Sequence, residues 1–165
     1  MRKTINKLLI LSLALGTIPF SGAAQEKPAI VVHAFTAVSG VPWPYDMKQM
    51  AMQTVAELQR KHADHFAVSM EAPSSRMQVY ALDGEVTEWH PGNRAKRLVV
   101  GMGSGRETAK IRYWLTDEKG KKVFEHSDTI RAAFWGNGYA DSVGQLAQPF
   151  ADKIADRLAE AKLDR

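Results

Sequence analysis

The segment Thr108–Thr116 reads TAKIRYWLT, and this stretch does most to decide the fold. Apolar side chains occupy every second position from 109 to 115, a pattern that predicts a β-strand with one buried face. The next four residues, DEKG at 117–120, predict a turn with a glycine where positive φ is often needed. The chain then returns as a second strand from Lys122 to about Phe134, so the whole segment predicts a β-hairpin. The first strand alternates Ala109, Ile111, Tyr113 and Leu115 with Lys110, Arg112 and Trp114.

A buried strand and a helix are predicted near the start of the domain. Residues 29–35, AIVVHAF, are apolar almost throughout, which is typical of a central strand covered on both faces. His33 interrupts this run, and we expect it to be a hydrogen-bonded histidine of the core. Residues 46–61 carry apolar side chains at the i, i+3, i+4 spacing of an amphipathic helix. Asp46 at its start suits the positive end of the helix dipole.

Two further strands are predicted between this helix and the hairpin. Residues 66–71 alternate Phe66, Val68 and Met70 on one face. Residues 77–89 are again typical of a strand, divided by the pair Asp83-Gly84. That pair is either the tip of a two-residue hairpin or a bulge in one long strand, and of the two we expect the bulge.

The last predicted element is a long helix that begins at Asp141 or Ser142. Ser142 and Gln145 have the spacing of a capping box, and an apolar stripe follows as far as Leu158. Pro149 falls inside this helix, where it would cost about 3 kcal/mol or produce a kink.

These elements together predict one α+β (mixed α/β) domain. Strands and helices interleave without a strict β-α-β rhythm, and the chain has no repeat or internal linker. We expect a single, mixed and mostly antiparallel sheet with two main amphipathic helices packed on one of its faces.

The N-terminus predicts export. Residues 1–24 combine the basic residues Arg2, Lys3 and Lys7 with an apolar stretch and small residues at Ser21–Ala24, the pattern of a signal peptide cleaved after Ala23 or Ala24. The alternative is an uncleaved single anchor helix, but the apolar stretch is short for a membrane span. Residues 25–165 then form the mature domain, soluble in the periplasm or outside the cell.

Charge and composition exclude several classes of partner. The formal charge of +4 falls to about +1 once three basic residues leave with the signal peptide, so a nucleic-acid partner loses its main support. The chain has no cysteine, which excludes disulfides and a lipid anchor attached through cysteine. No integral membrane span is expected after cleavage.

A distinctive segment follows the strand at 77–89. It begins Gly92-Asn93-Arg94-Ala95-Lys96-Arg97, where Asn93 could cap a short helix through Val99 or Val100, and it ends in the alternating-glycine loop Gly101-Met102-Gly103-Ser104-Gly105. With the Asp117–Gly120 turn and the final amphipathic helix, this segment resembles the bacterial exported family of domain of unknown function 4410. The resemblance implies an envelope protein with a fold like small α/β domains of envelope assembly and secretion proteins. It supplies no catalytic residues.

Each candidate binding feature has a structural alternative. Gly101, Gly103 and Gly105 could cradle a phosphate, but the predicted order of helix, glycines and strand is the reverse of a phosphate loop, so a helix end is favoured. Arg94 and Arg97 could hold a carboxylate of a partner, or form part of a solvated charged face.

A metal site and a catalytic serine are weaker candidates. His62, Asp64 and His65 could bind zinc, although a histidine at a helix C-terminus is the commoner arrangement. Ser104 lies between two glycines, which is typical of a turn. We therefore expect no catalytic residue, no metal and no cofactor.

A more suggestive set is aromatic: Trp43, Tyr45, Trp89, Trp114 and Trp135. We expect Trp114 to face away from the apolar side of its strand. If that face of the sheet is open, Trp114 marks a contact surface; if a helix covers it, Trp114 belongs to the core. The leading hypothesis is a non-enzymatic domain that binds another envelope protein or itself. The alternative is a binder of small molecules or glycans, with the loop Trp43–Tyr45 and the glycine loop as pocket walls. A hydrolase is least favoured.

Overall fold

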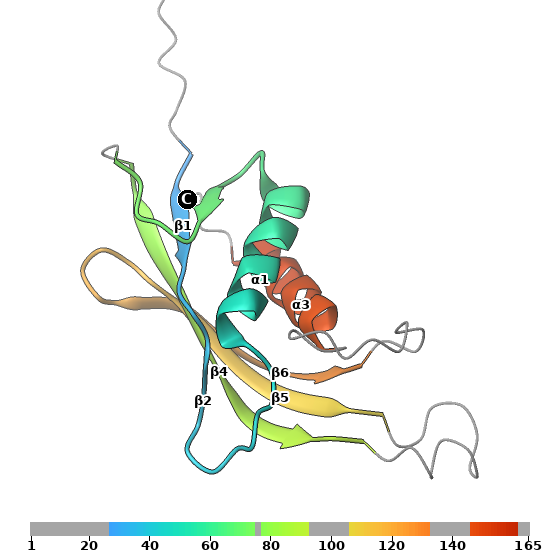
Figure 1. The fold of residues 1–165 in the computed structure, drawn as a ribbon. Helices are drawn as coiled ribbons and strands as arrows, with labels where there is room; N and C mark the ends of the chain where they lie inside the picture. Colours follow the sequence, from blue (N-terminus) through green and yellow to red (C-terminus); the bar gives the residue numbers. More distant parts are fainter. Residues whose placement is uncertain (1–26, 75–76, 93–105, 133–145, 162–165) are drawn as a thin grey trace, which may run out of the picture.

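Over the residues that it describes, a computed structural model shows a mixed β-sheet with two helices against one of its faces (Figure 1). The structure describes residues 27–74, 77–92, 106–132 and 146–161. Within these ranges the strands are β1 (Ala29–Val32), β2 (Thr36–Ala37), β3 (Ala67–Ser69), β4 (Val79–His90), β5 (Thr108–Thr116) and β6 (Lys122–Arg131). The helices are α1 (Met47–His62) and α3 (Ala147–Glu160).

The sheet order is β3-β1-β4-β5-β6, and the short β2 pairs with β4. β1 runs parallel to both of its neighbours, and all four of its residues are buried, as predicted for a central strand. β4, β5 and β6 are consecutively antiparallel and contain the longest pairings of the sheet. The sheet is therefore mixed, as the sequence predicts.

The β5–β6 hairpin matches its prediction closely. Buried and open positions alternate along β5 as expected, and Gly120 in the turn has φ of 75°. The Asp117 carboxylate stabilises this turn by accepting hydrogen bonds from the backbone N–H groups of Lys119 and Lys121, both at 2.9 Å. The turn therefore connects the two paired strands, and the alternation along β5 places its polar side chains on one face of the sheet.

The helix predicted over 46–61 is confirmed as α1. The Asp46 side chain caps it, accepting from the N–H groups of Lys48 and Gln49 at 2.8 and 3.0 Å. Met50 and Leu58 are buried as predicted, and Glu57 is also buried, which the helical spacing did not predict.

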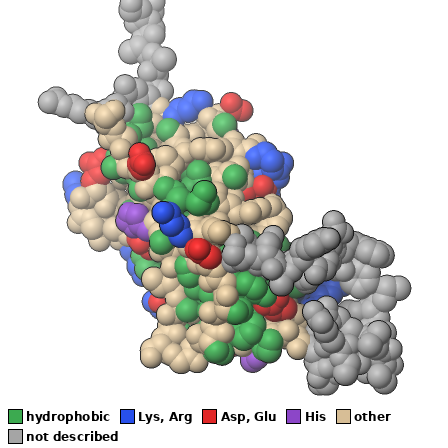
Figure 2. Space-filling model, viewed as in Figure 1, with side chains coloured by type: hydrophobic (Ala, Val, Ile, Leu, Met, Phe, Trp, Pro, Cys, Tyr) green, Lys and Arg blue, Asp and Glu red, His purple; other side chains and the backbone are tan. Residues whose placement is uncertain are grey.

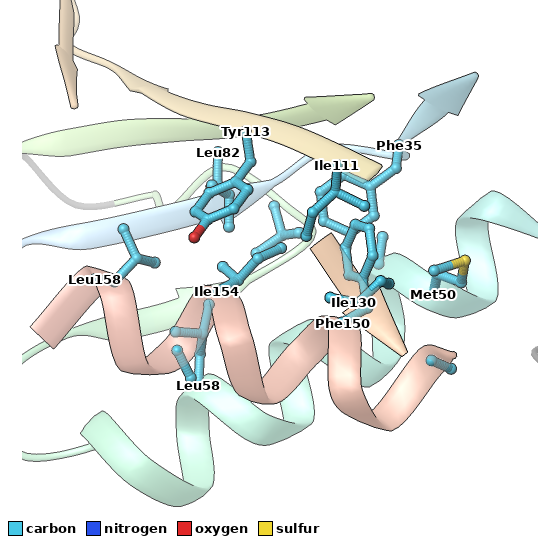
Figure 3. Close-up of a cluster of buried hydrophobic side chains, with 14 of the residues drawn as sticks. Phe35, Met50, Leu58, Leu82, Ile111, Tyr113, Ile130, Phe150, Ile154 and Leu158 are labelled. Atoms are coloured by element: carbon cyan, nitrogen blue, oxygen red, sulfur yellow. The ribbon is translucent and has the colours of Figure 1, made fainter. Parts of the chain in front are cut away.

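The core lies between the two helices and the sheet (Figure 3). Leu58 of α1 and Ile154 of α3 pack on each other and toward the sheet. The Phe35 ring meets the Phe150 ring of α3 at a centroid distance of 4.8 Å. Other fully buried members of this core are Leu82, Ile111, Tyr113, Leu115 and Leu158.

β4 is a single strand, so the prediction of one long strand is correct and the location of its bulge is wrong. The register between β4 and β5 shifts between Val86 and Glu88, whereas Gly84 pairs regularly with Tyr113. Gly84 instead provides room for Phe35, because a Cβ added there would lie 2.8 Å from the Phe35 ring. The glycine marks a close approach of a buried ring.

Two further predictions need correction. α3 begins at Ala147 with Leu146 as its N-cap, later than the predicted start at Asp141 or Ser142, so Pro149 falls in the first turn and disrupts no helical hydrogen bond. His33 is not a core residue: it follows β1, its side chain is 50% exposed, and its Nδ1 lies 2.8 Å from Asp83 Oδ1.

Several predicted features lie outside the described residues. They are the signal peptide at 1–24, the short helix after Asn93, the glycine loop, the end of the hairpin at Phe134 and the capping pair Ser142 and Gln145. Of the described helices, neither combines the length and apolar character needed to cross a membrane.

Candidate interaction surface

Trp114 lies on the face of the sheet opposite α1 and α3. Its neighbours along β5, Tyr113 and Leu115, are fully buried on the helix side, whereas Trp114 is partly exposed. It pairs in register with Asp83 of β4 and Glu125 of β6, so it occupies the middle strand of three antiparallel strands. We call this side of the sheet the open face, defined by the outward side chains of β4, β5 and β6.

Two cations lie over the Trp114 ring. Lys122 Nζ is 4.8 Å from the ring centroid and Arg112 Cζ is 5.5 Å from it. Contacts of this kind contribute about 0.5–1 kcal/mol at exposed positions. The hairpin turn places Lys122 beside Thr116 and therefore within reach of the indole.

The charges around Trp114 are paired within the open face. Arg112 Nη2 lies 2.9 Å from Glu85 Oε1, and Arg112 Nε lies 3.7 Å from Glu125 Oε1. Lys122 Nζ lies 2.8 Å from the same oxygen of Glu125, and this hydrogen bond lowers the pKa of that carboxyl. Trp114 is therefore surrounded by side chains whose charges are already compensated.

A second polar cluster ties the loop before α1 to the sheet. Glu107 is buried, and its Oε1 accepts hydrogen bonds from the Tyr45 hydroxyl at 2.6 Å and from Trp89 Nε1 at 2.7 Å. Trp43 packs edge-on against both aromatic rings, at centroid distances of 5.2 and 6.4 Å. Within the described part of the chain, the buried Trp43 Nε1 has no hydrogen-bond partner. We call Trp43, Tyr45, Trp89 and the carboxylate residue Glu107 that joins them the aromatic cluster.

The space-filling view shows the surface near this loop (Figure 2). Hydrophobic side chains gather in the lower half of the view, where the segment between β2 and α1 lies.

A small hollow lies elsewhere on the domain, at the β5–β6 turn. Its volume is about 160 Å³, and it is lined by Gln78 and residues 117–119. Pockets for small ligands usually measure about 300–1,000 Å³.

A third cluster joins β6 to α3. Asp128 Oδ2 accepts the Tyr113 hydroxyl at 2.8 Å, while Arg157 Nη2 and Lys153 Nζ lie 3.5 and 3.8 Å from Oδ1. Burial opposes ionisation of Asp128, but the hydrogen bonds and cations outweigh it and lower its pKa. Burial and the Asp128 carboxylate raise the pKa of Tyr113, so this hydroxyl remains a donor.

Of the binding residues predicted from the sequence, only Trp114 falls within the described residues. Trp114 is on the open face, as the interaction hypothesis requires. Arg94, Arg97, Gly101, Gly103 and Gly105 lie outside the described residues. Of the residues considered for zinc, His62 points to α3, with Nε2 2.9 Å from the Ala155 carbonyl oxygen, and its ring centroid is 6.5 Å from that of His65.

Sequence reasoning missed Glu107 and the partners of Trp114. Glu107 lies two residues before Ala109, so extending the alternation of the strand by one step would have placed it on the buried side. The proximity of Lys122 to Trp114 follows from the length of the turn. Predicting this proximity requires the register between β5 and β6, which the alternation within each strand leaves open.

Two solved structures with TM-scores above 0.5 share this fold. An uncharacterised protein is 18% identical, with a TM-score of 0.53, over 80% of this chain and 90% of that chain. A Xanthomonas campestris protein of the family DUF330 is 11% identical, with a TM-score of 0.51, over 86% and 91%. The PelC dodecamer of Paraburkholderia phytofirmans is 16% identical, with a TM-score of 0.48, over 79% and 87%.

No curated protein matches the chain. One family model matches residues 44–134, which extend from the loop before α1 past the end of β6 and include the open-face residues of β4, β5 and β6. This match covers more than half of the sequence. The chain thus belongs to the family described as a domain of unknown function, DUF4410.

Proposed function

We propose that the protein is an exported, non-enzymatic interaction domain that binds another protein of the bacterial cell envelope through the open face around Trp114. The observation that carries this proposal is the position of Trp114. It is a large aromatic side chain on the side of the sheet away from both described helices. Tryptophan is enriched among the few residues that dominate binding energies at protein interfaces.

The charges of the open face favour its use as an interface. A lone charge buried by a partner would lose its hydration without compensation, at a cost of several kcal/mol. Arg112 and Lys122 already have carboxylate partners within the same face, so a partner that covers Trp114 leaves neither of them unpaired. The methylene stems of both side chains extend the apolar surface offered by the indole.

Support for a non-enzymatic role comes from the polar groups most suited to chemistry. The Glu107 carboxylate binds Tyr45 and Trp89, Asp128 binds Tyr113 and cations of α3, and His62 contacts a carbonyl of α3. Each of these contacts joins two elements of the domain. We attribute them to stability.

Support for export comes from residues 1–24, with their basic, apolar and small-residue segments. An exported domain of this size would meet its partners in the periplasm or at the cell surface. A protein of the envelope is therefore the proposed partner, in preference to a nucleic acid.

The proposal is tested by crosslinking the tagged full-length protein in cells and identifying captured proteins by mass spectrometry. Trp114→Ala should reduce capture of the partner about tenfold or more while the domain remains folded, because the side chain is partly exposed. Met52→Ala removes another exposed hydrophobic side chain, 53% exposed on α1, and should leave capture unchanged. Equal capture by wild type and Trp114→Ala would refute this assignment.

One observation favours a second function, the binding of a small molecule or glycan at the aromatic cluster. The buried Trp43 Nε1 could donate a hydrogen bond to a ligand oxygen, with Trp89 and Tyr45 beside it. A ligand bound to the native state raises the unfolding temperature. A screen of sugars should then give stabilisation that Trp43→Phe abolishes, and the absence of any stabilising compound would argue against this function.

A further inference from the structure

We propose that the outer edge of β6 pairs with β6 of a second copy of the chain, antiparallel and with a two-fold axis beside Ser127. This inference uses a different surface from the partner site at Trp114 and does not depend on it. The argument rests on the position of β6 in the sheet and on the order of its side chains.

β6 ends the sheet. In residues 27–74, 77–92, 106–132 and 146–161, the only strand that pairs with it is β5. Its ten residues therefore present an edge of main-chain N–H and C=O groups that can extend the sheet. A strand of this length is a suitable template for β-strand addition.

Symmetry restricts how a second copy can add to this edge. Two antiparallel strands of one sheet are related by an axis perpendicular to the sheet, so both copies have their helices on the same side. Residues facing the helices in one copy then lie opposite residues facing the helices in the other. Residues of the open face likewise lie opposite residues of the open face. The possible registers of this strand pair therefore differ from one another by steps of two residues.

The register centred on Ser127 matches the chemistry of the opposed side chains. On the helix side, Phe124 lies opposite Ile130 and His126 lies opposite Asp128 of the other copy. On the open face, Glu125 lies opposite Thr129 and Ser127 lies opposite Ser127. No like charges are opposed, and an apolar pair and a histidine–carboxylate pair are formed twice by the symmetry.

The neighbouring registers are unfavourable. A shift toward His126 as the centre would place His126 opposite itself and Phe124 opposite Asp128. A shift toward Asp128 would bring two Asp128 carboxylates together on the axis. Opposed like charges destabilise a strand pair, so the side chains select the Ser127 register.

Exposure along β6 agrees with this arrangement. Val123 is 40% exposed, one of two large hydrophobic side chains with high exposure in the described part of the chain. In the Ser127 register it lies opposite Arg131 of the second copy, whose methylene stem can cover it. Glu125 is diagonal to the same Arg131, where opposite charges attract.

The absence of cysteine from the sequence allows a direct test with single cysteines introduced into the full chain. In Ser127→Cys the two Cα atoms face each other across the axis, about 4.5 or 5.5 Å apart, depending on the type of antiparallel pair. Either separation is within the range that a disulfide spans, about 4.4–6.8 Å. Mild oxidation should convert most of this variant into a covalent dimer that a reductant reverses.

The register is tested by Glu125→Cys and Thr129→Cys. In each variant alone, the two cysteines are four residues apart along the paired strands, about 13 Å, and should remain unlinked. A mixture of the two variants should form a mixed disulfide, because position 125 lies opposite position 129. Equal crosslinking of all single variants, or none in Ser127→Cys and in the mixture, would overturn the proposed pairing.

Ser127→Glu gives an independent test without oxidation. The new carboxylate lies beside Arg112 in its own copy but opposite an identical carboxylate across the axis. It should weaken the dimer about tenfold in sedimentation equilibrium while the domain stays folded. Thr116→Glu, beside Lys122 and away from the edge, is the matched control and should leave the dimer intact. A wild-type protein that sediments as a monomer at every concentration would also overturn the proposal.

Discussion

Gly84 is a residue of β4 at which the packing leaves no room for a side chain. Its φ is not positive, so this position requires glycine for the missing side chain and not for backbone freedom. The Phe35 ring occupies the space above it, 2.8 Å from where a Cβ would be, and packs onward against Phe150 of α3. A methyl group at position 84 would therefore displace a buried ring.

We predict that Gly84→Ala lowers the free energy of unfolding by about 1–3 kcal/mol, the usual cost of overpacking a core. Urea unfolding measures this change. Phe35→Leu serves as the partner in a double-mutant cycle, because the smaller side chain leaves room for the new methyl group. A coupling of about 1 kcal/mol is expected, and additive effects would show that the contact is not the cause.

Glu57 is a buried acidic residue whose pKa is lowered in the folded protein. Its carboxylate is buried, and Arg60 Nε donates to it at 3.0 Å. Lys61 of the same helix lies 3.4 Å from it and also reaches Asp152 of α3 at 3.0 Å. The Arg60 hydrogen bonds outweigh burial and lower the pKa of Glu57 from 4.5 to about 2.

The lowered pKa of Glu57 determines how this residue contributes to the pH dependence of stability. A depressed folded-state pKa stabilises the fold above the unfolded value of 4.5, and this contribution is lost as the pH falls toward about 2. Glu57→Gln should cost about 1–3 kcal/mol at pH 7, and its difference from wild type should shrink between these two pH values. Chemical unfolding at several pH values measures it. Glu71→Gln, at an exposed carboxylate, is the control, and a pH-independent difference for Glu57→Gln would contradict the account.

At the scale of single elements, α3 shows how a correct helical pattern can have a wrong boundary. The apolar stripe of Phe150, Ile154 and Leu158 is buried as predicted. The helix nevertheless begins at Ala147, and its N-cap Leu146 makes no side-chain capping bond. Pro149 therefore occupies the first turn, where its missing N–H would have no helical partner.

Pro149→Ala distinguishes a proline in the first turn of α3 from a proline in the interior of a longer helix. In the first turn of the helix, the substitution should change the free energy of unfolding by less than about 1 kcal/mol. In a helix interior, removal of the proline would relieve a penalty of about 3 kcal/mol. Thermal or urea unfolding decides between them, and a stabilisation of that size would place the proline inside the helix.

The elements that the sequence predicts best are those whose pattern is local. The alternation along β5, the Asp117–Gly120 turn and the face of α1 all depend on residues close in sequence, and all are confirmed. The register shift near Thr87 and the role of Gly84 depend on strands and rings distant in sequence. No local pattern encodes them, which explains why the sequence places the bulge at the wrong residue.

The candidate site is predictable only in part for the same reason. The direction of Trp114 follows from alternation along its own strand, but whether that face is open depends on where both helices pack. The sequence therefore leaves open whether Trp114 is a core or a contact residue. The placement of α1 and α3 on the opposite face favours a contact surface at Trp114. Its cationic neighbours, Arg112 and Lys122, come from β5 and β6.

At the scale of the whole molecule, the proposed function assigns stability to one face of the sheet and binding to the other. One face holds the core and the two helices, and polar clusters at Glu57, Glu107 and Asp128 join its elements. The other face carries Trp114 and paired charges, and the β6 edge lies at its border. The two surfaces could act together, since a dimer through β6 would place two open faces side by side in one extended sheet.

The most direct test of the central claim is site-specific photo-crosslinking in cells. A photoreactive residue replaces Thr116, which is two residues from Trp114 on the open face, or Met52, which is exposed on α1. The account predicts an adduct with the same envelope protein from position 116, absent from position 52, and lost when Trp114→Ala is added. An adduct from position 52 alone, or one from position 116 that survives Trp114→Ala, would contradict it.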